Sequence, residues 1–116
     1  MEILVNVTSD KKDLVKAGNA VKGFKDVIGS KIKMCGAIIF TKDEVDEKTG
    51  EATTKIVSAI KGADGEFITS VSPTVKNSLE LIVNTYDKDE ILKGIEVMIK
   101  SKKSNAGRDF IYIDLV

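Results

Sequence analysis

Alternation of apolar and polar side chains is the feature that most limits how this chain can fold. A period of two places every second side chain on the same face of a strand, so that one face can be buried and the other left in water. Together with a high content of Thr, Ile and Val, this alternation predicts strands in residues 2–8, 30–41, 52–61, 66–71, 91–102 and 109–115.

One segment departs from this pattern and has the period of a helix. In residues 73–86 the apolar side chains recur three or four positions apart, Ser72 can cap the first turn, and Pro73 is tolerated at the first helical position. The helical stripe consists of Val75, Leu79, Ile82 and Tyr86. Residues 10–29 fit neither period, and two glycines interrupt them, so we interpret them as a short strand or a turn-rich connection.

The predicted order is a series of strands, one helix and two further strands. Gly36 interrupts the second strand, and glycine in a strand interior commonly marks a bend or a bulge. A bent strand in this order is typical of the OB-fold, a small Greek-key barrel that binds oligonucleotides or oligosaccharides. We therefore expect one OB-like domain over residues 1–116, mainly β with one helix, built as an antiparallel barrel of five to six strands.

The composition argues against most catalytic and metal-binding roles. The sequence has no histidine, which removes the commonest general base and the commonest metal ligand, and Cys35 has no second cysteine as a partner. Neither a phosphate-cradling glycine loop nor a calcium loop is present. We expect no enzyme activity, no metal, no cofactor and no small-molecule substrate. The single cysteine, with no membrane span and no signal-peptide pattern, predicts a cytoplasmic protein.

The last predicted strand carries two aromatic side chains on the face opposite its apolar one. Ile111, Ile113 and Leu115 share one face, and Phe110, Tyr112 and Asp114 share the other. Flat rings beside cations form a surface that binds single-stranded nucleic acid without sequence preference. The same rings could instead pack under another segment, with the lysines merely solvated. The candidate nucleic-acid-binding residues are Phe110, Tyr112, Phe40, Lys100, Lys102, Lys103, Arg108, Lys31 and Lys33.

The formal net charge is zero, from 18 basic and 18 acidic residues, which argues against a diffuse attraction to nucleic acid. Binding of a polyanion then requires that the lysines gather on one face. The sequence separates the signs in part, because acids cluster in residues 43–51 and lysines dominate residues 11–33. Ordinary solvated surface explains these lysines equally well. This second basic set consists of Lys11, Lys12, Lys16, Lys22 and Lys25, joined by Lys31 and Lys33.

With these residues in place, the chain resembles the small single-stranded DNA-binding proteins of bacteriophages that replicate linear genomes by protein priming, the Salasvirus type. The segment ADGEFITSVSPTV (residues 63–75), the apolar pair at 81–82 and the spacing of Ser104, Gly107 and Phe110 before the final alternation carry the resemblance. A weaker similarity covers residues 24–25 and 33–40. The middle strands carry few tyrosines, and the nearest aromatic residues, Phe40 and Phe67, lie in apolar patterns that favour core packing.

The resemblance implies cooperative, non-specific coating of displaced single strands during phage DNA replication. Single-stranded DNA is then the expected partner, with self-association into a homo-oligomer as a further option. An alternative function from a different class is a small phage protein-interaction module, a regulator or inhibitor that docks through a sheet edge. The neutral charge and the few aromatic residues favour that alternative. The two functions differ in whether the chain has affinity for oligonucleotides.

Overall fold

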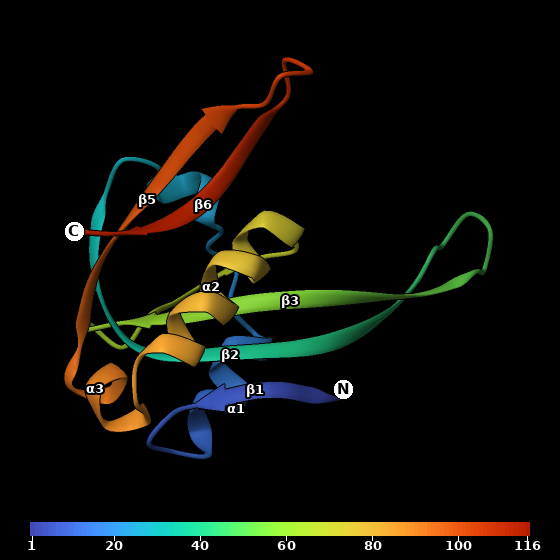
Figure 1. The fold of residues 1–116 in the computed structure, drawn as a ribbon. Helices are drawn as coiled ribbons and strands as arrows, with labels where there is room; N and C mark the ends of the chain where they lie inside the picture. The colour runs from blue at the N-terminus through green and yellow to red at the C-terminus, as the bar shows by residue number, and fades with distance from the viewer.

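The longest element of the chain, strand β2 (Lys31–Val45), organises the sheet. In the computed structural model, which describes residues 1–116, β2 pairs with one strand along one edge and with two strands in turn along the other. The other elements are β1 (Ile3–Val7), α1 (Lys12–Gly18), the 3-10 helix η1 (Phe24–Val27), β3 (Ala52–Gly62), β4 (Phe67–Ser70), α2 (Pro73–Thr85), α3 (Lys88–Lys93), β5 (Ile95–Lys103) and β6 (Asp109–Leu115). The strand order is β4-β3-β2-β5-β6, with β1 beside β2, and every strand pairing is antiparallel (Figure 1).

The mainly β architecture and the positions of most strands are confirmed, but the prediction of a single helix is wrong. Helix α1 lies in the segment that we interpret from the sequence as a short strand or a turn. The sequence does not indicate this helix because its two buried side chains, Asp13 and Ala17, do not form an apolar stripe. Helix α3 occupies the start of the predicted strand 91–102, where it buries Ile91. Ser72 precedes α2 as predicted but makes no side-chain cap. No helix in the structure has the length and apolar character needed to cross a membrane.

The predicted OB-like barrel is not confirmed, because the sheet is not closed: no strand pairing joins β4 to β6. A segment from the N-terminal third lies along the free edge of β4 instead. The backbone N–H of Thr69 donates to the carbonyl oxygen of Lys22 at 3.1 Å, and Gly23 forms an isolated parallel bridge with Thr69. The η1 turn that follows buries Phe24. The edge at which a barrel would close is therefore partly occupied by residues 22–24.

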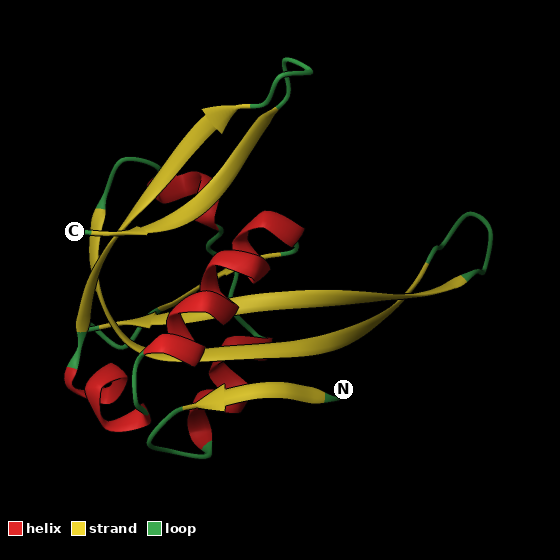
Figure 2. Cartoon of the chain, in the orientation of Figure 1, coloured by secondary structure: helices red, strands yellow, loops and turns green.

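Both faces of the central strands are buried. Ala37 and Ile39 of β2 belong to the main core, which α2 covers (Figure 2). Ile38 and Phe40 alternate with them and belong to a second cluster, which contains Ala17 of α1. A register shift between Met34 and Gly36 lies just before this stretch, so the predicted bend in β2 is confirmed as an irregularity of the pairing.

Two hairpins extend beyond the packed body (Figure 1). Residues 42–45 of β2 pair only with β3, and we call this hairpin, residues 42–55, the acidic arm. Beyond its pairing with β2, strand β5 pairs only with β6, and we call residues 100–112 the basic arm. The acidic arm thus contains the end of β2, whereas β5 of the basic arm pairs with the start of β2, and this separation keeps the arms apart at the surface.

A charged contact fastens α1 to the sheet. The Nζ atom of Lys61, on β3, lies 3.1 Å from Oδ1 and 3.2 Å from Oδ2 of Asp13. The Asp13 side chain is 2% exposed, so its carboxylate has given up nearly all of its water. A buried carboxylate is tolerated only while its cation stays in place.

Replacing Lys61 with methionine keeps the apolar stem and removes the cation, so we expect Lys61→Met to lower the free energy of unfolding by about 3 kcal/mol. Urea denaturation followed by circular dichroism measures this loss. The double variant Asp13→Leu with Lys61→Met removes both charges and should recover most of the stability. An unchanged denaturation midpoint for Lys61→Met would show that the contact does not hold α1 in place.

Candidate nucleic-acid interface

The register of β5 and β6 separates the core residues from the candidate binding residues. Ile113 is buried in the main core. On the opposite face, Lys100 stands across from Tyr112 and Lys102 stands across from Phe110. The alternation predicted for the last strand is confirmed, and it brings two rings and two cations together.

The same face continues onto the first residues of β2. Lys31 stands across from Met98 of β5, and Lys33 stands across from Glu96. The stem of Lys33 lies over Gly94, whose φ is 110° and where an added Cβ would collide with that side chain. We call this surface the outer face; it consists of Lys31, Lys33, Glu96, Met98, Lys100, Lys102, Phe110, Tyr112 and Asp114.

The two rings on the outer face lie next to each other and are partly exposed. The ring centroids of Phe110 and Tyr112 are 6.0 Å apart and the ring planes are inclined by 42°. Neither ring belongs to a core cluster or packs against one, whereas Ile111 between them packs against the main core. Tyr112 also lines a groove of about 440 Å³ between β6 and α2. Ring surface is therefore available at this hairpin.

Phe40 does not share this environment. Its side chain is 2% exposed and belongs to the cluster under α1. A base could reach the Phe40 ring only if α1 left the sheet. The structure therefore brings together eight of the nine candidate residues around one hairpin and the start of β2, and keeps Phe40 apart from them.

The cations around the outer face differ in whether they have an acidic partner. The Nζ atom of Lys100 lies 2.7 Å from Oδ2 of Asp114. This hydrogen bond lowers the pKa of Asp114 and raises the pKa of Lys100. The alternation of the last strand predicts Asp114 on the same face as Tyr112, but it does not indicate that Asp114 pairs with Lys100. The cations that form no ion pair are Lys31, Lys33, Lys102, Lys103 and Arg108.

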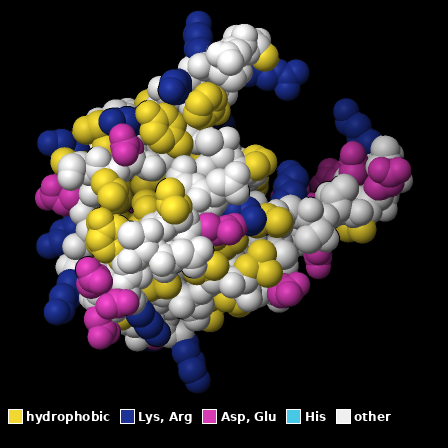
Figure 3. Space-filling view, in the orientation of Figure 1, with side chains coloured by type: hydrophobic (Ala, Val, Ile, Leu, Met, Phe, Trp, Pro, Cys, Tyr) yellow, Lys and Arg dark blue, Asp and Glu magenta, His cyan; other side chains and the backbone are white.

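Charges of opposite sign gather on the two arms. Asp43, Asp46, Glu47 and Glu51 are exposed on the acidic arm, and basic side chains project from the end of the basic arm (Figure 3). The pair between Lys55 and Glu44, 2.9 Å apart, neutralises part of the acidic arm. A molecule with no net charge thus presents a basic and aromatic surface at one hairpin, as binding of single-stranded nucleic acid requires.

Comparison with known families identifies a phage protein family. The sequence profile described as phage single-stranded DNA-binding protein matches residues 6–116 of the chain. Neither the curated proteins nor the solved structures contain a match to the chain.

The Lys100–Asp114 pair predicts a specific titration. Because the folded chain lowers the pKa of Asp114 below its ordinary value of 3.8, the pair stabilises the fold above that value and is lost as the pH falls through the lowered pKa. We expect Lys100→Met to raise the pKa of Asp114 toward 3.8, as measured by ¹³C NMR of the side-chain carboxyl. Lys102→Met is the matched control and should leave the titration unchanged. An unaltered Asp114 titration in Lys100→Met would contradict the pairing.

Proposed function

The chain belongs to the phage single-stranded DNA-binding protein family, and from this premise we propose that its outer face holds the DNA strand. Family membership supports single-stranded DNA binding in phage replication as the general function. In the proposal, bases stack on Phe110 and Tyr112 while the cations around them bind phosphates. The observation that carries it is the placement of two partly exposed rings directly across the hairpin from two lysines.

Stacking on the two rings accounts for binding without sequence preference. Every base offers a flat π face, and stacking on an aromatic side chain contributes about 1–3 kcal/mol per base. The centroid distance of 6.0 Å between the rings of Phe110 and Tyr112 lets neighbouring bases contact one ring each. In a duplex the base faces are stacked on each other, so this surface favours single strands.

A cation without an acidic partner contributes more to DNA binding than one held in an ion pair. Lys102 and Lys31 are exposed without an acidic partner and can bind phosphate directly. Lys100 is held by Asp114, so it orders the hairpin and contributes less to DNA binding. Each phosphate neutralised on a single strand adds about −0.7 to the slope of log affinity against log salt. The affinity should therefore fall steeply as salt is raised.

The test is the double variant Phe110→Ala with Tyr112→Ala. We expect it to weaken binding of fluorescent oligo(dT) by about 1–3 kcal/mol for each stacked base that is lost. Fluorescence anisotropy at several salt concentrations, with duplex DNA in parallel, measures the effect. The fold should survive, because neither ring packs against a core cluster.

The matched control is Phe110→Tyr with Tyr112→Phe, which keeps both rings and should keep the affinity. Circular dichroism of both double variants checks the fold. Equal binding of single-stranded and duplex DNA by the unmodified chain, or no binding, would remove the proposal. A chain without oligonucleotide affinity that forms a stable complex with a host or phage protein would instead be the interaction module.

A further inference from the structure

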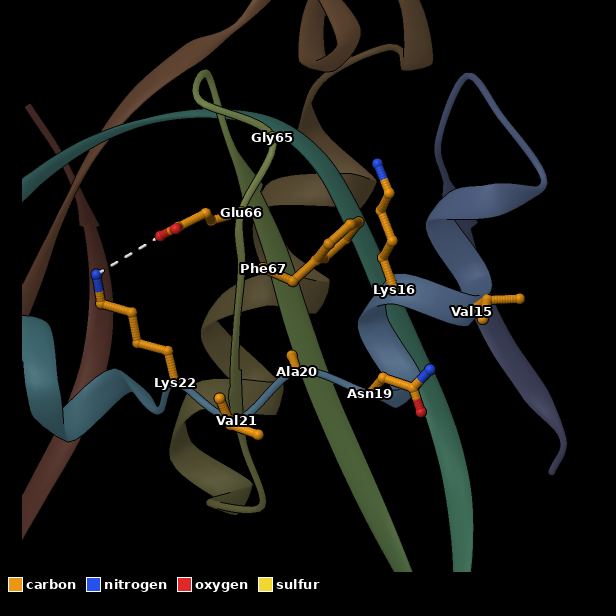
Figure 4. Close-up of a pocket in the computed structure, with 9 residues that line it drawn as sticks. All are labelled: Val15, Lys16, Asn19, Ala20, Val21, Lys22, Gly65, Glu66 and Phe67. Carbon is orange, nitrogen blue, oxygen red and sulfur yellow. Dashed lines mark ion pairs between the residues drawn. The ribbon is translucent and has the colours of Figure 1, made fainter.

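The largest hollow on the surface lies away from the outer face, between α1 and the turn that joins β3 to β4. It has a volume of about 570 Å³ (Figure 4). Lys16 of α1 and Phe67 of β4 reach into it from two elements, and residues 19–22 form its remaining wall. Lys16 and Lys22, two members of the second basic set that do not belong to the outer face, line this hollow.

The lining of this hollow combines apolar surface with cations. Val15 and Val21 are 64% and 99% exposed, whereas Phe67, which lies at the base of the wall, is only 5% exposed. Lys16 forms no ion pair, and Asn19 adds an amide that can donate and accept hydrogen bonds. Apolar surface suits the face of a base, and an unpaired ammonium suits a phosphate. This chemistry fits a nucleotide better than a purely apolar or purely anionic ligand.

The one acid on the lining is Glu66, and it is engaged by Lys22. The Nζ atom of Lys22 lies 3.8 Å from Oε2 of Glu66, and the two side chains are 49% and 65% exposed (Figure 4). An exposed pair at this distance contributes little to stability. A phosphate can therefore replace Glu66 as the partner of Lys22 at little cost.

Lys22 and Glu66 also connect this hollow to the start of β2. Both residues line a second hollow of about 240 Å³, whose other wall includes Ser30 and Ile32. Ile32 faces the main core, opposite to Lys31 and Lys33, but Ser30 directly precedes Lys31 of the outer face. A strand of DNA that turns around the start of β2 from Lys31 would meet the second hollow, the Lys22–Glu66 pair and then the first hollow.

We propose that the hollow between α1 and β4 is a second nucleotide site on the same DNA strand, with Lys22 passing from Glu66 to a phosphate when DNA binds. This inference rests on the proposed binding of DNA at the outer face and extends the track beyond it. The site takes one base against the exposed side chain of Val21, with its phosphates held by Lys16 and Lys22.

The proposal predicts that removing an acid will strengthen binding. Glu66→Gln frees Lys22, and we expect it to tighten oligo(dT) binding about two- to fivefold, the factor that an exposed ion pair is worth. Lys22→Gln should weaken binding and reduce the salt slope by about 0.7. In the Lys22→Gln background, Glu66→Gln should lose most of its effect. The measurement is fluorescence anisotropy in about 0.1 M salt, where charges farther apart than roughly 10 Å are screened.

The matched control is Glu80→Gln, which makes the same change of net charge and frees Lys76 on α2, outside both hollows. It should leave the affinity for oligo(dT) unchanged.

A second pair of variants tests the contact with the base: Val21→Asp should weaken oligo(dT) binding, whereas Val45→Asp on the acidic arm should not. Free dTMP is the third probe, and it should compete poorly with oligo(dT) because the site acts as part of a track.

Three results would overturn the inference. The first is that Glu66→Gln and Glu80→Gln change the affinity for oligo(dT) equally. The second is that Glu66→Gln still tightens oligo(dT) binding in the Lys22→Gln background. The third is that dTMP binds tightly and Glu66→Gln improves this binding while oligo(dT) binding stays constant. Failure of the outer face is recognised separately, because the unmodified chain would then lack preference for single-stranded DNA.

Discussion

The pairing of β2 with different partners along its two edges is the constraint on which the rest of the structure depends. One edge is committed to β3, and the other is divided between β5 at the start of the strand and β1 farther on. The register shift between Met34 and Gly36 falls where this edge changes partner. Gly36 fits there because an added Cβ would press on the carbonyl oxygen of Val7, at 3.3 Å, and on Lys61 Cβ, at 3.2 Å. Since β5 pairs with the start of β2, whereas the acidic arm is formed by the end of β2 and by β3, the two hairpins reach the surface as separate arms.

Sequence reasoning succeeds here where a side-chain period is the direct cause of the structure. Alternation places β6 and its two faces correctly because one face is buried and a shift by one residue would expose it. The helical period identifies α2 for the same reason. Helix α1 escapes such reasoning because it is held by Asp13, whose partner Lys61 lies 48 positions away in the sequence. Closure of the barrel is equally non-local, since residues 22–24 lie along β4 and no period in the sequence indicates that placement.

The candidate site was also predictable only where it follows from the alternation of a strand. The sequence places Phe110 and Tyr112 on the face away from the core, and the register brings Lys100 and Lys102 across from them. Whether a ligand can reach each ring or lysine depends on the tertiary structure. Phe40 sits on an alternating strand as Phe110 does, but α1 covers it. Lys100 and Lys102 are two residues apart, yet only Lys100 has an acidic partner, Asp114. Counting lysines and rings along the chain therefore overestimates what a ligand can reach.

A neutral chain can still attract a polyanion if its charges lie farther apart than the distance over which salt screens them. The Debye length is about 8 Å at physiological ionic strength, whereas the molecule measures 44 × 39 × 23 Å. The acidic arm carries four of the exposed acids, Asp43, Asp46, Glu47 and Glu51, and projects from the body away from the end of the basic arm (Figures 1 and 3). The exposed acids beside the cations of the outer face are Glu96 and Asp109. A phosphate close to Lys102 and Arg108 thus senses the cations around it and little of the acidic arm. The zero in the total charge describes a sum over the whole surface, and a DNA strand at the outer face interacts with only one region of it.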